Sequence, residues 1–148
     1  MGYEYLMGKN LVIYYVDDDP EDLDVLAEIG MGMGIEVIPI HETNGVQDKI
    51  CAEKEGTKVI FLDVNMPVRS GFDLLEELKH SETCHNFPIV TFSTGHDLET
   101  IEKCWQLGAD MYIRKGQSVV RYKEILAQVN SIDWQHYTRN EENFILTA

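Results

Sequence analysis

The sequence predicts an α/β domain in which five parallel β-strands alternate with five α-helices in a doubly wound sheet. Its apolar runs are continuous and rich in Val and Ile, a pattern typical of strands that are buried on both faces. Helical stretches separate these runs, and such alternation is typical of parallel strands joined by right-handed crossovers. The length of 148 residues and the hydrophobic content of 44% suit one domain with its own core.

Five apolar runs mark the expected strands. The first, LVIYYV, carries no charged residue, and the second, EVIPI, is the shortest. Runs of this length and composition favour strands over helices. The predicted strands cover Leu11–Val16, Glu36–Ile40, Lys58–Val64, Pro88–Ser93 and Asp110–Lys115.

Each run is followed by a stretch with apolar residues at helical spacing. The first stretch opens with Asp19 as a candidate N-cap and Pro20 at the first helical position. Gly108 suits the end of the fourth. The predicted helices lie within Asp19–Gly30, Gly45–Gly56, Ser70–Ser81, Asp97–Gly108 and Ser118–Ile132.

The overall charge and the termini limit the classes of function. A net charge of −14 argues against direct binding of a nucleic-acid backbone, which requires Lys and Arg patches. No segment approaches the run of about 18 apolar residues that marks a membrane span, and the first ten residues lack a signal-peptide pattern. We therefore expect a cytoplasmic protein that binds neither nucleic acid directly nor a membrane.

The cysteines indicate no disulfide framework. They are three in number and form no C-x-x-C motif, so we expect reduced thiols. His80, Cys84 and His85 lie close together in the sequence, but a zinc site there would need a fourth ligand. A polar loop is the preferred interpretation of that segment.

Polar side chains follow the predicted strands at one edge of the sheet. Asp17 and Asp18 end the first strand, Asp63 the third, Ser93 the fourth and Lys115 the fifth. In an open parallel sheet, ligands bind beyond these carboxyl ends. Three converging carboxylates repel one another unless a cation lies between them, and Mg²⁺ prefers such oxygen ligands.

This combination of groups points to phosphoryl transfer. Asp63 can act as a nucleophile that forms an aspartyl phosphate. Mg²⁺ would neutralise charge on the phosphoryl oxygens, while Lys115 would pair with one oxygen and Ser93 would hydrogen-bond another.

Four segments resemble the receiver domain of two-component response regulators over about residues 8–132. These segments are VDDDPED, LDVNMPVRSGFDLL, PIVTFST and GADMYIRKG, and the second has the family's spacing from Asp63 through Met66 and Pro67 to Gly71. The resemblance implies a flavodoxin-like (βα)5 fold with strand order 2-1-3-4-5. It also implies a phosphoacceptor protein, not an enzyme, whose donor is a histidine kinase or phosphotransfer protein and whose downstream protein partner is unknown.

The resemblance assigns a role to each site residue. Asp63 is the expected phosphoacceptor, with Lys115 and Ser93 as its catalytic partners. Mg²⁺ is expected to bind Asp18 directly, Asp17 through water, Asp63 and the backbone carbonyl of Asn65. The expected switch residues are Ser93 and Tyr112.

The sequence departs from the family at three residues, of which one follows Lys115 and two follow Ser93. Gly116 replaces the usual proline after Lys115, so we predict a trans peptide bond or a rearranged loop there. Thr94 is larger than the usual residue and predicts restricted access to the phosphoryl group. Gly95 offers no side chain to orient water, which predicts slow autodephosphorylation.

The expected boundaries are a receiver domain over residues 1–132 and a C-terminal extension over 133–148, without a separate output domain. The extension is expected either to pack through Trp134 and Phe144 or to form a flexible tail. The main alternative function is a receiver-like interaction module that is not phosphorylated. A hydrolase of the haloacid dehalogenase type is disfavoured because Asn65 replaces its acid, and a flavodoxin-like cofactor binder lacks a Gly-rich loop here.

Overall fold

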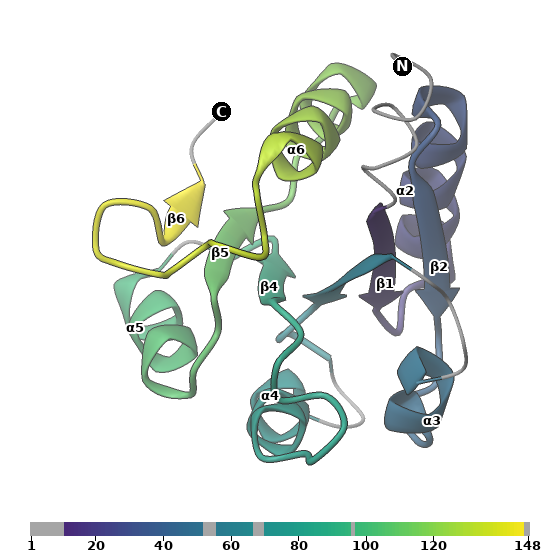
Figure 1. Ribbon diagram of the computed structural model, residues 1–148. Coiled ribbons are helices and arrows are strands. Elements are labelled where there is room, and N and C mark those ends of the chain that lie inside the picture. Colours follow the sequence, from purple (N-terminus) through teal and green to yellow (C-terminus); the bar gives the residue numbers. More distant parts are fainter. Residues whose placement is uncertain (1–10, 52–55, 67–69, 96, 147–148) are drawn as a thin grey trace.

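The chain folds around one parallel sheet with helices on both faces (Figure 1). The computed structural model describes residues 11–51, 56–66, 70–95 and 97–146. Six strands pair in the order β2-β1-β3-β4-β5-β6, and every pairing is parallel. They are β1 (Leu11–Val16), β2 (Glu36–Ile40), β3 (Thr57–Leu62), β4 (Ile89–Ser93), β5 (Met111–Arg114) and β6 (Ile145–Leu146).

This topology confirms the predicted class and the order of the first five strands, while the prediction of five strands was wrong. The two-residue β6 extends the sheet beyond β5. The predicted third strand was also too long, because β3 ends at Leu62 and Asp63 follows it. All five predicted helices are present, namely α2 (Pro20–Met33), α3 (Val46–Cys51), α4 (Gly71–Lys79), α5 (Leu98–Gln106) and α6 (Val119–Ser131).

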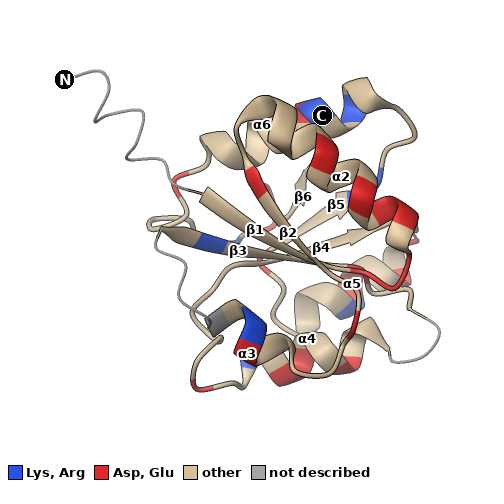
Figure 2. Ribbon diagram, turned by 90° about the vertical axis from the view of Figure 1, so that its right-hand side faces the viewer, with Lys and Arg blue, Asp and Glu red and all other residues tan. Residues whose placement is uncertain are grey.

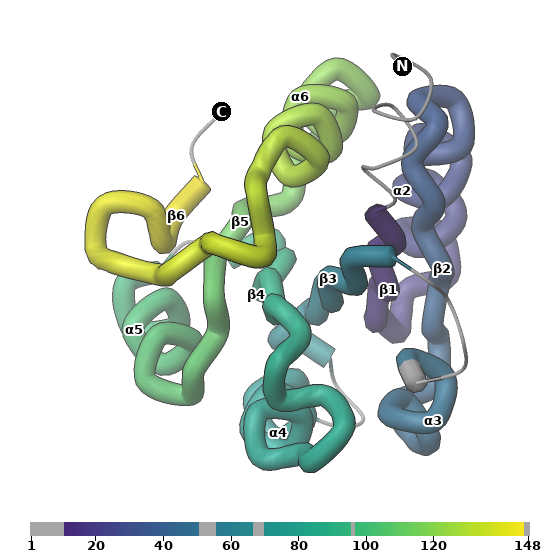
Figure 3. The backbone as a smooth tube through the Cα atoms, viewed as in Figure 1, coloured from purple at the N-terminus to yellow at the C-terminus, as the bar shows by residue number. Residues whose placement is uncertain are grey.

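The helices form two layers, which the tube view shows on opposite sides of the sheet (Figure 3). Leu26 of α2 and Leu126 of α6 belong to one buried cluster, and Leu75 of α4 and Cys104 of α5 belong to the other. Strand β1 supplies both clusters, since its alternate side chains point to opposite faces. Burial on both faces explains why the strands appear in the sequence as continuous apolar runs.

The predicted start of α2 and the predicted glycine after α5 are confirmed, whereas α2 continues to Met33, beyond its predicted end at Gly30. The Asp19 side chain accepts a hydrogen bond from the backbone N–H of Glu21, and Pro20 opens α2. Gly108 follows the cap of α5 with φ of 98°, a left-handed conformation that glycine adopts at little cost.

The C-terminal extension is packed onto the domain. Trp134 and Phe144 are both buried, one in each cluster, which confirms the packed alternative over the flexible tail. The backbone N–H of Tyr112 donates to the carbonyl of Phe144, and this bond brings β6 alongside β5.

Acidic residues are prominent along α2 (Figure 2). In the part of the chain that the structure describes, no helix combines the length and apolar character needed to cross a membrane. The acidic residues of α2 are Glu21, Asp22, Asp24 and Glu28, and the first two lie in its first turn.

Candidate functional site

The sheet brings the three predicted carboxylates together. One oxygen each of Asp17, Asp18 and Asp63 lies within 4.8 Å of the other two. The backbone N–H of Asp63 donates to the carbonyl of Val16 and that of Asp17 to Ile40, so the pairing of neighbouring strands fixes the spacing. Among the described residues, this is the single group of three or more His, Cys, Asp or Glu side chains that could hold a metal ion.

Lys115 forms ion pairs with two of these acids, Asp17 and Asp63, and with Asp22. Its Nζ atom is 2.6 Å from Asp17 Oδ2, 3.1 Å from Asp63 Oδ2 and 2.9 Å from Asp22 Oδ2. Its backbone N–H donates to the Ser93 carbonyl, which continues the pairing of β4 and β5. The Lys115–Gly116 bond is trans, as predicted, and the lysine nevertheless reaches the acids.

Burial and the neighbouring charges shift the pKa values of the three carboxyl groups in different directions. Burial opposes ionisation of Asp17, but hydrogen bonds from Lys115 and Tyr15 outweigh it and lower the pKa of Asp17. For Asp63, burial together with the negative charge of Asp17 raises the pKa. Burial and the neighbouring Asp17 charge also raise the pKa of Asp18.

The lysine is held in its charged form. Burial alone would lower the pKa of Lys115, but the hydrogen bond to Asp17 and the charge of Asp63 raise it above its ordinary value. One ammonium group cannot balance three clustered carboxylates and Asp22. A hard divalent cation with oxygen ligands therefore fits this donor set.

Backbone hydrogen bonds further orient the two central acids. The N–H of Asp19 donates to Asp17 Oδ1 at 3.0 Å, and the N–H of Asn65 donates to Asp63 Oδ1 at 2.9 Å. The other oxygen of Asp63, Oδ2, accepts from Lys115 Nζ. These contacts leave both carboxylates in defined orientations.

Ser93 and Tyr112 lie next to this pocket. The Asn65 side chain donates a 2.6 Å hydrogen bond to Ser93 Oγ, and Ser93 is fully buried. The Tyr112 hydroxyl donates to the Gly95 carbonyl, and burial raises the pKa of Tyr112 to about 12. The predicted switch residues are therefore both buried, and each makes a side-chain hydrogen bond.

Gly71 explains part of the motif that follows Asp63. A side chain at this position would collide with the carbonyl of Asp63 and with Cα of Val64. The start of α4 packs directly against the backbone of the Asp63 segment, and Ser70 caps the helix by accepting from the N–H of Phe72. The glycine thus permits the close approach that fixes Asp63 against α4.

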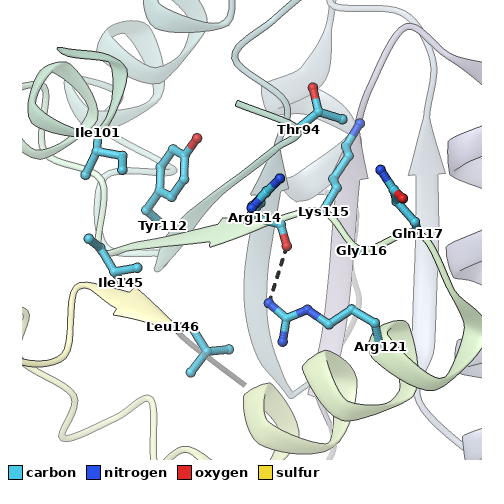
Figure 4. A pocket seen from close by; sticks show the side chains of 10 residues that line it. All are labelled: Thr94, Ile101, Tyr112, Arg114, Lys115, Gly116, Gln117, Arg121, Ile145 and Leu146. Atoms are coloured by element: carbon cyan, nitrogen blue, oxygen red, sulfur yellow. Dashed lines mark hydrogen bonds between the residues drawn. The ribbon is translucent and has the colours of Figure 1, made fainter. Parts of the chain in front are cut away.

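A hollow of about 630 Å³ lies beside the acidic pocket (Figure 4). Figure 4 shows Ile101 of α5 and the two residues of β6 on one side, and Arg121 of α6 on the other. An Arg121 side-chain nitrogen donates to the Arg114 carbonyl at 3.5 Å. Tyr112 and Lys115 both line this hollow, so the acidic pocket and the C-terminal extension border the same space.

Comparison with known proteins decides the family. Residues 13–127 match the response regulator receiver domain. The chain belongs to this family. Two-component response regulator ARR11 of Arabidopsis thaliana is 30% identical over 131 residues, which cover 88% of this chain and 23% of ARR11. Regulatory protein VanRc of Enterococcus gallinarum is 32% identical over 110 residues, which cover 74% of this chain and 44% of VanRc.

The receiver chain thus spans less than half the length of these two curated relatives. Among solved structures, chemotaxis response regulator CheY4 of Vibrio cholerae matches with a TM-score of 0.68 and 22% identity over 80% of this chain and 98% of that chain. The Mn(2+)-bound form of response regulator Rcp1 matches with a TM-score of 0.67 and 20% identity over 87% and 98%. At these identities the likeness establishes the receiver fold.

All predicted site residues are among the described ones and converge on this end of the sheet. Sequence reasoning missed Asp22, although its acidic side chain lies one turn from the strand end.

The segment with His80 and His85 does not form a metal site, since Nδ1 of each ring contacts a backbone carbonyl and Cys84 is buried.

Proposed function

We propose that this receiver accepts a phosphoryl group on Asp63 from a histidine kinase or phosphotransfer protein, in a Mg²⁺-dependent reaction. The contacts of Lys115 with both Asp17 and Asp63 carry this proposal. They place a fixed ammonium group beside an acidic pair and a separate carboxylate that can act as the nucleophile. We also propose that the protein is cytoplasmic and transforms no other substrate.

Each residue has a part in the transfer. An Asp63 oxygen attacks phosphorus, a bond from oxygen to phosphorus forms, and the donor's leaving group departs with its electron pair. Lys115 is placed to pair with a phosphoryl oxygen, because its Nζ already lies 3.1 Å from Asp63 Oδ2. Asp17, Asp18, Asp63 and the Asn65 carbonyl would hold Mg²⁺, which supplies charge neutralisation when bound.

A new phosphoryl group would change the hydrogen bonding behind Asp63. The Ser93 hydroxyl now accepts from Asn65 and would turn toward a phosphoryl oxygen. The space that Ser93 leaves lies beside Tyr112, whose hydroxyl contacts Gly95. We propose that this rearrangement alters the surface around β5 that a downstream protein partner recognises.

Acetyl phosphate with Mg²⁺ tests the proposal directly. Intact mass spectrometry should show one added phosphoryl group on the wild type and none on Asp63→Asn. The matched control is Asp73→Asn, an exposed aspartate on α4, which should still be modified. An unmodified wild type would instead favour the interaction module that is not phosphorylated.

A further inference from the structure

Lys115 has a third carboxylate partner that lies outside the cluster of three aspartates. Asp22 Oδ2 is 2.9 Å from Lys115 Nζ, although 93 residues separate the two in the chain. The Asp22 side chain is 35% exposed, whereas those of Asp17 and Asp63 are 0% and 8% exposed. Asp22 therefore stands at the mouth of the pocket and meets the ammonium group from the solvent side.

A cation and the Lys115 ammonium group compete for the same oxygens. The Lys115 ammonium group donates hydrogen bonds to Oδ2 of Asp17 and to Oδ2 of Asp63. These two aspartates also belong to the group of carboxylates that could hold a metal ion. A divalent cation there would repel the ammonium group. Among the described ion pairs of Lys115, the one with Asp22 lies outside the cluster.

Asp22 is well placed to keep this contact. It lies in the first turn of α2, which Asp19 caps and Pro20 opens, so its backbone is fixed next to the strand end. An acidic side chain in the first turn of a helix interacts favourably with the helix dipole, but that effect needs no partner such as Lys115. Stabilisation of the helix therefore does not explain the ion pair between Asp22 and Lys115.

We propose that Asp22 is a positioning residue that retains the Lys115 ammonium group at the mouth of the pocket when a divalent cation binds Asp17 and Asp63. Lys115 then stays within reach of a phosphoryl group without opposing the cation. This role rests on the proposed function, because it concerns the same cation site.

Mg²⁺ affinity of the unphosphorylated protein tests this role by isothermal titration calorimetry. Asp22→Asn should raise the Kd for Mg²⁺ by about fivefold, the size expected for a partly exposed ion pair. Asp24→Asn is the matched control, because it removes the same charge from an exposed position on the same helix. It should change the Kd by less than about twofold. Equal effects of the two variants, or no effect of Asp22→Asn, would overturn the proposal.

A double-mutant cycle separates positioning of the lysine from direct attraction of the cation. In a Lys115→Met background, Asp22→Asn should change the Kd by less than about twofold, since the group that Asp22 positions is gone. A fivefold effect that persisted in this background would show that Asp22 acts on the cation by itself and would refute the proposal.

A spectroscopic readout covers the case in which Lys115→Met does not fold. The ¹⁵N signal of the Lys115 ammonium group should persist in the Mg²⁺-saturated wild type and be lost to exchange with water in Asp22→Asn. An equally persistent signal in both proteins, or a wild type that binds no Mg²⁺, would overturn the role of Asp22. Phosphorylation of the wild type by acetyl phosphate is scored separately, so a failure of the proposed function is distinguishable.

Discussion

Phe144→Ala should detach the C-terminal extension from the domain. The Phe144 side chain is 4% exposed and meets the Trp105 ring edge-to-face, with ring centroids 5.1 Å apart. Its carbonyl accepts the hydrogen bond from Tyr112 that aligns β6 with β5. Removal of the ring therefore takes away the main apolar anchor of the strand that borders Tyr112.

The size of the effect follows from burial. Truncation of a buried phenylalanine to alanine costs about 3–5 kcal/mol, and the aromatic pair contributes about 0.5–1.5 kcal/mol of its own. The loss in free energy of unfolding cannot exceed the free energy that holds the extension on the domain. A larger loss would leave the extension detached while the sheet stays folded. We therefore expect a loss near the lower end, about 3 kcal/mol, which corresponds to a fall in Tm of roughly 6–12 °C.

Urea denaturation followed by circular dichroism measures the loss of stability. Ile145→Ala is the control on the same strand, since Ile145 is 44% exposed and should lose less than about 1 kcal/mol. Amide exchange adds a local reading. The Tyr112 N–H, which donates to the Phe144 carbonyl, should exchange on the order of 100-fold faster in Phe144→Ala.

A small effect of Phe144→Ala would contradict the anchoring role of Phe144. A loss of less than about 1 kcal/mol for Phe144→Ala, with unchanged exchange at Tyr112, would mean that Phe144 does not anchor β6. Exchange of the wild-type Tyr112 N–H at the free energy of global unfolding would mean that the extension and the sheet unfold as one unit and that the assumed local opening is wrong.

Three further predictions concern the acidic pocket. Gly71→Ala should destabilise the protein by about 1–3 kcal/mol in urea denaturation, because the new side chain meets the backbone of Asp63 and Val64; wild-type stability would contradict this. Asp18→Asn should raise the Tm of the metal-free protein at pH 7, since a folded pKa raised above the unfolded value makes the ionised carboxyl unfavourable. That gain should fade as pH falls through the raised pKa of Asp18, and a gain that is constant from pH 7 to 4 would count against the pKa shift. Removal of Mg²⁺ with EDTA should lower the stability of the wild type by about 2.7 kcal/mol when the ion was present at 100 times its Kd, and Asp18→Asn should lose less than half as much.

The sheet and the predicted site residues could be inferred from the sequence for one physical reason. Helices on both faces bury the central strands, so each strand appears as a continuous apolar run such as Leu11–Val16. Parallel strands end at a common edge, so the residues just after these runs must meet. Asp17, Asp63 and Lys115 meet there because strand pairing alone brings them together.

The sixth strand could not be inferred in this way. Ile145 and Leu146 form only a two-residue strand, and Ile145 is largely exposed, so no buried apolar run marks them. The strand exists because Phe144 and Trp134 hold the extension on the domain. The sequence showed those two anchors but not the edge of the sheet to which they bring the chain.

Asp22 shows a different limit of sequence reasoning. In the first turn of α2 it has the same charge and the same favourable position as Glu21, so helix physics gives no reason to separate the two. Only Lys115, 93 residues later, separates them, because its amine reaches Asp22 across the pocket mouth. A residue of this kind is identified by a contact between distant segments, and its role therefore has to be tested together with that partner, as the cycle with Lys115→Met does.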